Sequence, residues 1–203
     1  WYADEFRKAI AAGLKAAAET GGSTTTWVMN NHDVPRSPSR YGLPQVKGAP
    51  YHQLPHDWLL RDGTTYPENR ELGTRRARAA ALMELGLPGA AYIYQGEELG
   101  LFEVADIPWD HLEDPTAFHT TRNALAIRQE SLTATRDTTA EQVDMGADVV
   151  AYRRAAVEGR TFTSVTNFGT APVSLPEGSV VLTSGPLTPD GQLPTDTSAW
   201  VIK

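Results

Sequence analysis

The stretch 24–33, with the sequence TTTWVMNNHD, decides the fold class of this chain. Residues 24–30 are an apolar, β-branched run with the length of a buried strand, and His32 and Asp33 follow it directly. Folds of the α/β class build their sites where strands end, so an imidazole and a carboxylate at this point predict polar chemistry. A second such run, 89–94, ends in the polar and acidic residues 95–98. We expect both strands to lie in one sheet and to share one pocket.

The order of the predicted elements extends this interpretation along the chain. Helices are expected over 3–19, 70–86 and about 117–130, and they alternate with strands over 24–30 and 90–94, which predicts parallel strands joined by crossover helices. Residues 37–69 are rich in proline and aromatic residues and are predicted to be a long loop. Two parallel strands are too few for a stable sheet, so this half is expected to be part of a larger α/β structure.

The pattern changes after residue 131. Short β-rich segments separated by glycine, proline or asparagine are typical of an antiparallel β-sandwich, and they span 148–154, 161–168, 171–175, 179–183 and 198–202. The sequence therefore predicts two domains, 1–131 and 132–203.

Composition excludes several classes of function. The 203 residues carry a net charge of −7, which argues against nucleic acid and anionic membranes as partners. The chain has no cysteine, which excludes disulfides and zinc–sulfur sites. No apolar run is long enough to cross a bilayer and no signal peptide is visible, so a cytoplasmic protein is expected. The basic residues Arg70, Arg75, Arg76 and Arg78 are interpreted as the solvated face of a helix.

The polar residues at the two strand ends allow more than one interpretation. Asp33 and His32 suit the binding of sugar hydroxyls, because a carboxylate accepts two hydroxyl hydrogen bonds and an imidazole N–H donates another. The alternative is that Asn31 and Asp33 only cap a turn. For Glu97 and Glu98, capping or pairing with an arginine is favoured over a direct role in chemistry.

Other candidate side chains give weaker signals. Tyr92, Tyr94 and Trp109 could stack on a sugar ring, although packing is the favoured role of such aromatic residues. The histidines show no metal-ligand spacing, so neither a metal nor another cofactor is predicted. These histidines are His52, His56, His111 and His119.

Four motifs in order give a specific resemblance. The segments 31–36 (NHDVPR), 39–42 (SRYG), 75–83 (RRARAAALM) and 86–101 (GLPGAAYIYQGEELGL) resemble the late barrel region of the alpha-amylase family of glycoside hydrolases. Within that family the chain is most similar to the alpha-glucosidase and oligo-1,6-glucosidase branch. The resemblance covers residues 1 to about 118, and the tail 131–203 is similar to that branch's C-terminal β-sandwich.

The resemblance implies a fold and an activity. The fold would be the last two strands and helices of a (β/α)8 barrel, over 1–131, followed by a small antiparallel sandwich over 132–203. The parent enzyme would hydrolyse terminal α-glucosidic bonds of small α-glucosides or maltooligosaccharides with retention. Asp33 would be the catalytic carboxylate that stabilises the transition state, and His32 and Arg36 would bind substrate.

The chain also departs from the family pattern. No Asp or Glu matches the family's nucleophile or acid/base, which lie on earlier strands, so the chain alone is expected to be inactive. A signature segment that normally precedes the last helix is missing near Phe118-His119. Two alternatives therefore stay open: a non-catalytic carbohydrate-binding or structural fragment, and a glucosyl isomerase or transferase of the same family. Linkage preference and oligomeric state are not predicted.

Overall fold

The computed structural model describes residues 1–20, 25–49, 53–61, 66–103, 115–133 and 139–203. Helices α1 (Ala3–Glu19), α4 (Arg70–Gly86) and α5 (Pro115–Ile127) lie where the sequence predicts them, and the π-helical turn η1 (Arg128–Leu132) continues α5. The predicted loop 37–69 was wrong in part, because it contains the short helices α2 (Ser37–Gly42) and α3 (Gln53–Leu59). Pro38, in the first turn of α2, presets the backbone for a helix that the loop prediction overlooked.

Strands β1 (Thr26–Val28) and β2 (Ala90–Tyr92) form a two-stranded parallel sheet, as the helix–strand alternation predicts. Trp27 pairs with Ala91 and Val28 with Tyr92. One face of the pair packs toward the helices through Trp27 and Ala91. The other face is open to solvent, and Val28 and Tyr92 are 51% and 63% exposed there.

The C-terminal region forms a five-stranded antiparallel sheet with the order β3-β4-β5-β7-β6. Its strands are β3 (Glu141–Gln142), β4 (Val149–Ala155), β5 (Thr161–Asn167), β6 (Ser179–Thr183) and β7 (Thr197–Ile202), with the 3-10 turn η3 (Val157–Gly159) between β4 and β5. Beyond this sheet, Val173 and Leu193 form an isolated bridge. The antiparallel pairing is confirmed, and the sandwich and the domain division stay predictions.

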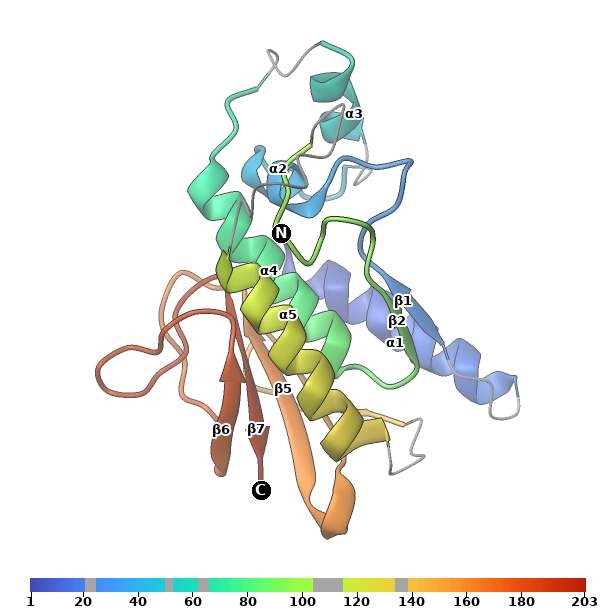
Figure 1. Ribbon diagram of the computed structural model, residues 1–203, viewed down its shortest axis with the longest axis vertical. Coiled ribbons are helices and arrows are strands. Elements are labelled where there is room, and N and C mark those ends of the chain that lie inside the picture. Colours follow the sequence, from blue (N-terminus) through green and yellow to red (C-terminus); the bar gives the residue numbers. More distant parts are fainter. Residues whose placement is uncertain (21–24, 50–52, 62–65, 104–114, 134–138) are drawn as a thin grey trace.

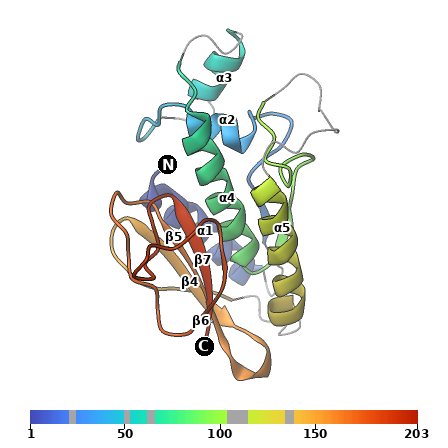
Figure 2. The same cartoon turned by 60° about the vertical axis from the view of Figure 1, so that its left-hand side comes forward.

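Helices lie between the parallel pair and the antiparallel sheet (Figures 1 and 2). Helix α4 contacts α2, α5, β5 and β7, and α1 contacts β4. Leu82 and Leu85 of α4 are in one core cluster with Phe162 and Trp200, and the Trp200 indole N–H donates to the Leu82 carbonyl at 3.0 Å. Helix α4 thus carries the core that both sheets share.

Three basic residues of α4, Arg75, Arg76 and Arg78, contact the antiparallel sheet and its loops, and the interpretation as a solvated face was wrong for them. Arg70 is exposed, as that interpretation expects. Arg76 Nε lies 2.9 Å from Asp196 Oδ1, and Arg75 Nη2 lies 3.5 Å from Asp196 Oδ2. Arg78 donates to the Ser184 carbonyl at 3.1 Å. Charge runs are usually solvated, but here the partner Asp196 lies about 120 residues away along the chain and cannot be seen in a local pattern.

Two glycines let α2 pack directly on α4. A Cβ atom at Gly73 would lie 2.0 Å from the Pro38 carbonyl oxygen, and one at Gly42 would lie 2.7 Å from the Asn69 carbonyl oxygen. The Asn69 backbone N–H also donates to the Gly42 carbonyl at 2.9 Å. The position of α2, and of the loop that leads into it from β1, therefore depends on the absence of side chains at these residues.

We expect Asp196→Asn to lower the free energy of unfolding by about 2 kcal/mol, because it leaves two arginines without their buried anion. Asparagine keeps the shape of the side chain and tolerates the φ of +55° at this residue. Urea unfolding measures the loss, and Asp190→Asn, on an exposed loop residue, is the matched control. Equal midpoints for the two variants would contradict a clamping role for Asp196.

We expect Gly73→Ala to destabilise the protein by about 2 kcal/mol through overpacking, although alanine is the better helix former by about 1 kcal/mol. The control is Thr74→Ala, which raises helix propensity at the next residue. Urea midpoints of the two variants are compared with wild type. A Gly73→Ala protein as stable as wild type would show that α2 does not depend on this close approach.

Candidate functional site

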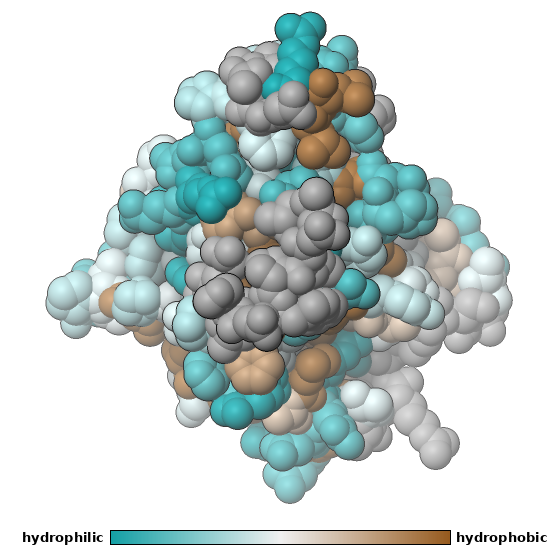
Figure 3. All heavy atoms as spheres, turned by 45° about the horizontal axis from the view of Figure 1, so that its top comes forward, coloured by the Kyte–Doolittle hydropathy of each residue, from teal (hydrophilic) through white to brown (hydrophobic). Residues whose placement is uncertain are grey.

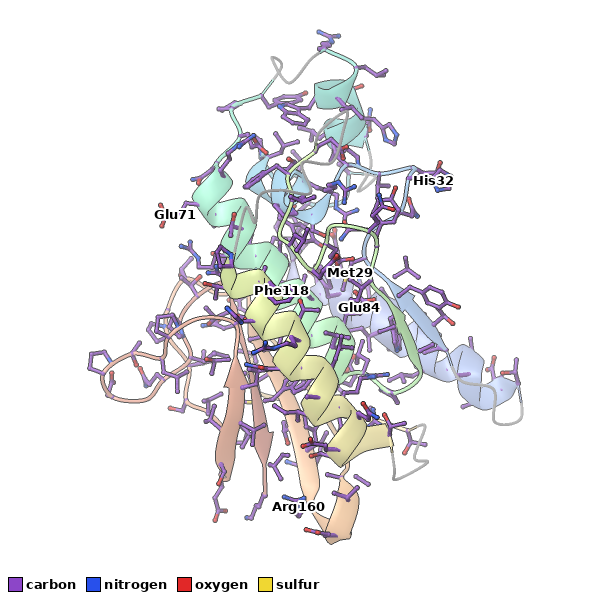
Figure 4. All side chains as sticks on the ribbon, viewed as in Figure 1. Met29, His32, Glu71, Glu84, Phe118 and Arg160 are labelled. Carbon is purple, nitrogen blue, oxygen red and sulfur yellow. The ribbon has the colours of Figure 1, made fainter. Side chains whose placement is uncertain are left out.

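The predicted residues lie where the parallel strands end. His32 and Asp33 follow β1 on an exposed turn, with side chains 82% and 75% exposed, and the His32 Nε2 and Asp33 Oδ1 atoms are 3.3 Å apart. Figure 4 shows His32 pointing outward from the loop beyond β1, away from α4. Both side chains are therefore available to a ligand that approaches this end of the sheet.

Asn31 shapes the turn that presents them. Its Oδ1 accepts a hydrogen bond from the Asp33 backbone N–H at 2.8 Å, which is an Asx-type turn. The turn-capping alternative is therefore confirmed for Asn31. The Asp33 carboxylate is paired with His32, so its remaining acceptor capacity faces solvent.

Arg36 lies inside the protein, where it joins the two strand ends. The residue is only 7% exposed, its guanidinium Nη1 donates to the Gln95 carbonyl, and its Cζ lies 5.0 Å from the centre of the Tyr94 ring. The Arg36 backbone N–H donates to Glu103 Oε2 at 2.8 Å. Substrate binding by Arg36 stays a prediction, and the contacts present join the loop after β1 to the loop after β2.

A second set of contacts, which the sequence did not predict, fixes Asn30, the residue before the turn. Asn30 is 3% exposed, and its Oδ1 accepts hydrogen bonds from the Ser37 backbone N–H at 2.9 Å and from Ser37 Oγ at 2.7 Å. The Asn30 amide also lies near the Glu97 carboxylate and lowers its pKa. The sequence could have indicated Asn30, because it is a polar residue at the end of an apolar strand. Nothing in the sequence around Ser37 indicated its role.

Glu97 lies beside these contacts. Its Oε2 accepts a hydrogen bond from the Tyr94 backbone N–H at 3.0 Å. Burial raises the pKa of the Glu97 carboxyl, opposed by the Asn30 amide, by the hydrogen bond from Tyr94 and by the charge of Arg40. Arg40 in turn donates from Nη2 to the Met29 carbonyl at 2.7 Å. The favoured expectation for Glu97, a capping or pairing role, agrees with these contacts.

Glu84 is a carboxyl near the same strand end that is fully buried, whereas Glu97 is only partly buried. Glu84 has 0% exposure, and neither of its oxygens has a hydrogen-bond partner among the described residues. Burial, together with the charge of Glu97, raises the pKa of Glu84 to about 8, against the opposing charge of Arg128. Glu84 is therefore protonated at neutral pH, because its ionised form would be less stable than its neutral form in this apolar interior.

Arg128 joins the end of α5 to the end of α4. Its guanidinium donates to the carbonyls of Leu85, Leu87 and Gly89, the Leu87 contact being 2.8 Å long. These carbonyls close α4 and lead into β2, so one cation satisfies the acceptors that a helix end leaves open. The start of β2 is thereby fixed against the helix layer.

A hollow of about 630 Å³ lies beside the turn. Its lining combines aromatic side chains with polar ones, and Asn31 and Val34 border it on either side of His32 and Asp33. Trp1, Phe6 and Tyr41 supply the aromatic wall, while Arg40 and Gln45 supply polar groups. A concave surface with aromatic and polar groups next to the predicted residues suits a small polar ligand.

Apolar and hydrophilic residues are mixed over the face that Figure 3 shows, with an apolar group over α3. The exposed large apolar residues of α3 and the residue after it are Leu59 and Leu60. Three further sequence candidates, His52, Trp109 and His111, lie outside the described residues. Tyr92 is exposed on β2, and Tyr94 lies under the Arg36 guanidinium.

Among the described residues, no group of three or more potential ligand side chains could hold a metal ion. Within the same part of the chain, no helix combines the length and the apolar character that crossing a bilayer requires.

Comparison with known proteins agrees with the resemblance seen in the motifs. No protein-family model matches the chain. Maltase 1 of Drosophila virilis is 30% identical over 96 residues, which cover 47% of this chain and 10% of that protein.

Solved structures match the fold along the whole chain. The trehalulose synthase MutB from Pseudomonas mesoacidophila MX-45 is 21% identical with a TM-score of 0.65, and the match covers 100% of this chain and 47% of that one. The alpha-glucosyl transfer enzyme XgtA is 19% identical with a TM-score of 0.63, over 100% of this chain and 44% of that one. The chain thus spans less than half the length of these proteins, and its resemblance to the alpha-amylase family is confirmed.

We expect the stability of the protein to fall as pH rises from about 4.5 to about 8, because folded Glu84 keeps its proton up to about 8 while an unfolded glutamate loses it near 4.5. Glu84→Gln should abolish this contribution, which amounts to at most about 5 kcal/mol. Urea unfolding at pH 5 and pH 8.5 measures it, with the exposed Glu130→Gln as control. The same pH dependence in Glu84→Gln and wild type would mean that Glu84 is ionised in the folded protein.

Proposed function

We propose that this chain is the C-terminal part of an alpha-amylase family enzyme that hydrolyses terminal α-glucosidic bonds with retention. The observation that carries the proposal is the position of Asp33 and His32. Both side chains are exposed on a turn at the carboxyl end of a parallel strand, beside a hollow with aromatic and polar walls. The ends of parallel strands are where barrel enzymes bind and transform their substrates.

The parallel pair β1–β2 supports a barrel origin. Parallel sheets are normally covered on both faces, yet Val28 and Tyr92 lie on a face that is open in this chain. Earlier strands of a (β/α)8 barrel would cover that face and pair with the free edges of β1 and β2. The antiparallel sheet would then belong to a C-terminal sandwich over 132–203, attached through α4.

Asp33 would act as the transition-state stabiliser. Its carboxylate can accept hydrogen bonds from two hydroxyls of the terminal glucose, and bonds that tighten as the ring distorts lower the barrier. His32, 3.3 Å from Asp33, would donate to a neighbouring hydroxyl and keep the carboxylate oriented. The nucleophile and the acid/base carboxyl would come from the earlier strands, so bond cleavage requires the complete barrel.

The segment 41–69 would shape the entrance of the site. Helix α3 lies at the end of the molecule toward which β1 and β2 point (Figure 1), and Pro44, Val46 and Leu54 line the hollow. We propose that this segment limits the length of the bound saccharide. The predicted cytoplasmic location and the absence of nucleic-acid and membrane partners remain predictions.

A second candidate is glucosyl transfer or isomerisation by the same site. The observation in its favour is that the solved structures matching the whole chain include a trehalulose synthase and an alpha-glucosyl transfer enzyme. Chromatography of the products from maltose separates the two: glucose alone supports hydrolysis, and a rearranged or longer saccharide supports transfer. A full-length protein that binds maltose without turnover would support a non-catalytic module.

We expect Asp33→Asn in the full-length protein to lower kcat for a chromogenic α-glucoside by about 10²–10³-fold, the cost of removing one strong electrostatic stabiliser. The unfolding midpoint should not change, because the Asp33 side chain is 75% exposed. Asp190→Asn, on an exposed loop residue of the C-terminal region, is the control. Unchanged turnover in Asp33→Asn would remove Asp33 from the mechanism.

A further inference from the structure

The exposed turn that carries His32 and Asp33 is fixed to the protein at its two ends. At the near end, Asn30 Oδ1 accepts hydrogen bonds from the Ser37 backbone N–H at 2.9 Å and from Ser37 Oγ at 2.7 Å. These bonds bring residues 30 and 37 together and close the base of the turn. The far end of the turn is Arg36, which follows Asp33 closely in the sequence.

Arg36 ties this turn to the loop after β2 through both its side chain and its main chain. Its guanidinium Nη1 donates to the Gln95 carbonyl, and its Cζ lies 5.0 Å from the centre of the Tyr94 ring. The Arg36 backbone N–H donates to Glu103 Oε2 at 2.8 Å. The Glu103 backbone N–H donates in turn to Ser39 Oγ at 3.0 Å. The loop after β1 and the loop after β2 are therefore joined on both sides of one arginine.

The Arg36 guanidinium is enclosed by protein groups rather than turned toward a ligand. The residue is 7% exposed, and its Nε atom has no hydrogen-bond partner among the described residues. The Gln95 carbonyl and the Tyr94 ring offset the burial of its charge, because a buried cation needs an acceptor or the face of an aromatic ring. Contact with a sugar would require the cation to leave both groups. The geometry therefore favours a role in holding the turn.

We propose that Arg36 is a positioning residue for the active site: it holds the far end of the turn against the loop after β2 and so sets where the Asp33 carboxylate lies. This role rests on the function proposed for Asp33, and it replaces the substrate contact that the family resemblance implies for Arg36. Only Val34 and Pro35 separate the two residues, and the proline ring fixes one backbone dihedral between them. A displacement of Arg36 is therefore passed on to Asp33.

Three variants separate the contacts of Arg36 from its bulk. Arg36→Met fills similar space but removes the charge and the donors, whereas Arg36→Lys keeps a charge and a donor and should restore part of the loss. Glu103→Ala removes the acceptor of the Arg36 backbone N–H at a residue that is only partly buried. Arg7→Met is the matched control, because the Arg7 guanidinium also donates to two backbone carbonyls, at 2.8 Å each, but joins α1 to the start of β4.

The first measurement is hydrogen–deuterium exchange, in the full-length protein, of the peptide that covers residues 30–37. The backbone N–H groups of Asp33, Arg36 and Ser37 in this peptide all donate to side-chain acceptors. We expect Arg36→Met and Glu103→Ala to speed its exchange by about tenfold or more relative to wild type, and Arg7→Met to leave it unchanged. Wild-type exchange in Arg36→Met, or in Glu103→Ala where Arg36→Met does not fold, would overturn the proposal.

The second measurement is a double-mutant cycle on kcat/KM in the full-length protein with a chromogenic α-glucoside. Arg36→Met alone should lower kcat/KM by about 10–100-fold, the usual cost of misplacing a reacting group by about 1 Å, and the loss should lie in kcat rather than in KM. In the Asp33→Asn background the same change should have little further effect, because the group that it positions is already lost.

The two measurements separate the possible failures. A rise in KM that persists in the Asp33→Asn background would mean that Arg36 binds substrate directly, and the proposal would be wrong. A loss of kcat of the same size in both backgrounds would mean that Arg36 supports the fold in general, which would also overturn it. The exchange readout needs no substrate, so faster exchange in Arg36→Met together with a wild-type protein that cleaves no α-glucoside would keep the support of the turn and reject the proposed function.

Discussion

The burial of helix α4 on several sides is the constraint on which the rest of the structure depends. From Ala79 to Gly86 nearly every residue is buried, with α2 and α5, the antiparallel sheet and the parallel pair around it. A helix enclosed in this way cannot carry a single apolar stripe, and small residues must replace bulky ones wherever a neighbour approaches closely. Gly73, against the backbone of α2, is the clearest case.

The same enclosure explains the unusual chemistry of the buried carboxyls. Glu84 lies on α4 and Glu97 lies after β2. Burial raises the pKa of Glu84, and the nearby charge of Glu97 adds to the shift because the interior screens charge poorly. Arg128 is near, but its donors are used by three carbonyls at the end of α4. The helix layer therefore meets the ends of the parallel strands through one fully buried carboxyl, Glu84, and one partly buried carboxyl, Glu97.

Above this layer the site separates into a fixed part and a free part. Asn30 is held by hydrogen bonds to Ser37, and Arg36 joins its own loop to Gln95 after β2. The side chains of His32 and Asp33 extend into solvent. A carboxylate that must hold a sugar through a change of ring shape benefits from a rigid support, because its placement then needs no rearrangement when substrate binds. The proposed assignment of catalysis to Asp33 follows this separation.

The sequence by itself determined the elements whose signals are local. The helices near 3–19 and 70–86, the two strands with their parallel pairing and the antiparallel strands after 140 follow from periodicity and turn residues. The place of His32 and Asp33 after β1 follows from the end of one apolar run, and the family resemblance follows from motifs that are short and ordered.

Only the tertiary structure decided which polar side chains are free and which are held. Arg36 lies against Gln95, 59 residues along the chain, and Arg76 meets Asp196 across 120 residues. The partner of such a side chain is set by how helices and sheets pack, and no local pattern encodes it. Burial decided the proton on Glu84 in the same way, since a glutamate in a helix is ordinarily solvated and ionised until its neighbours enclose it.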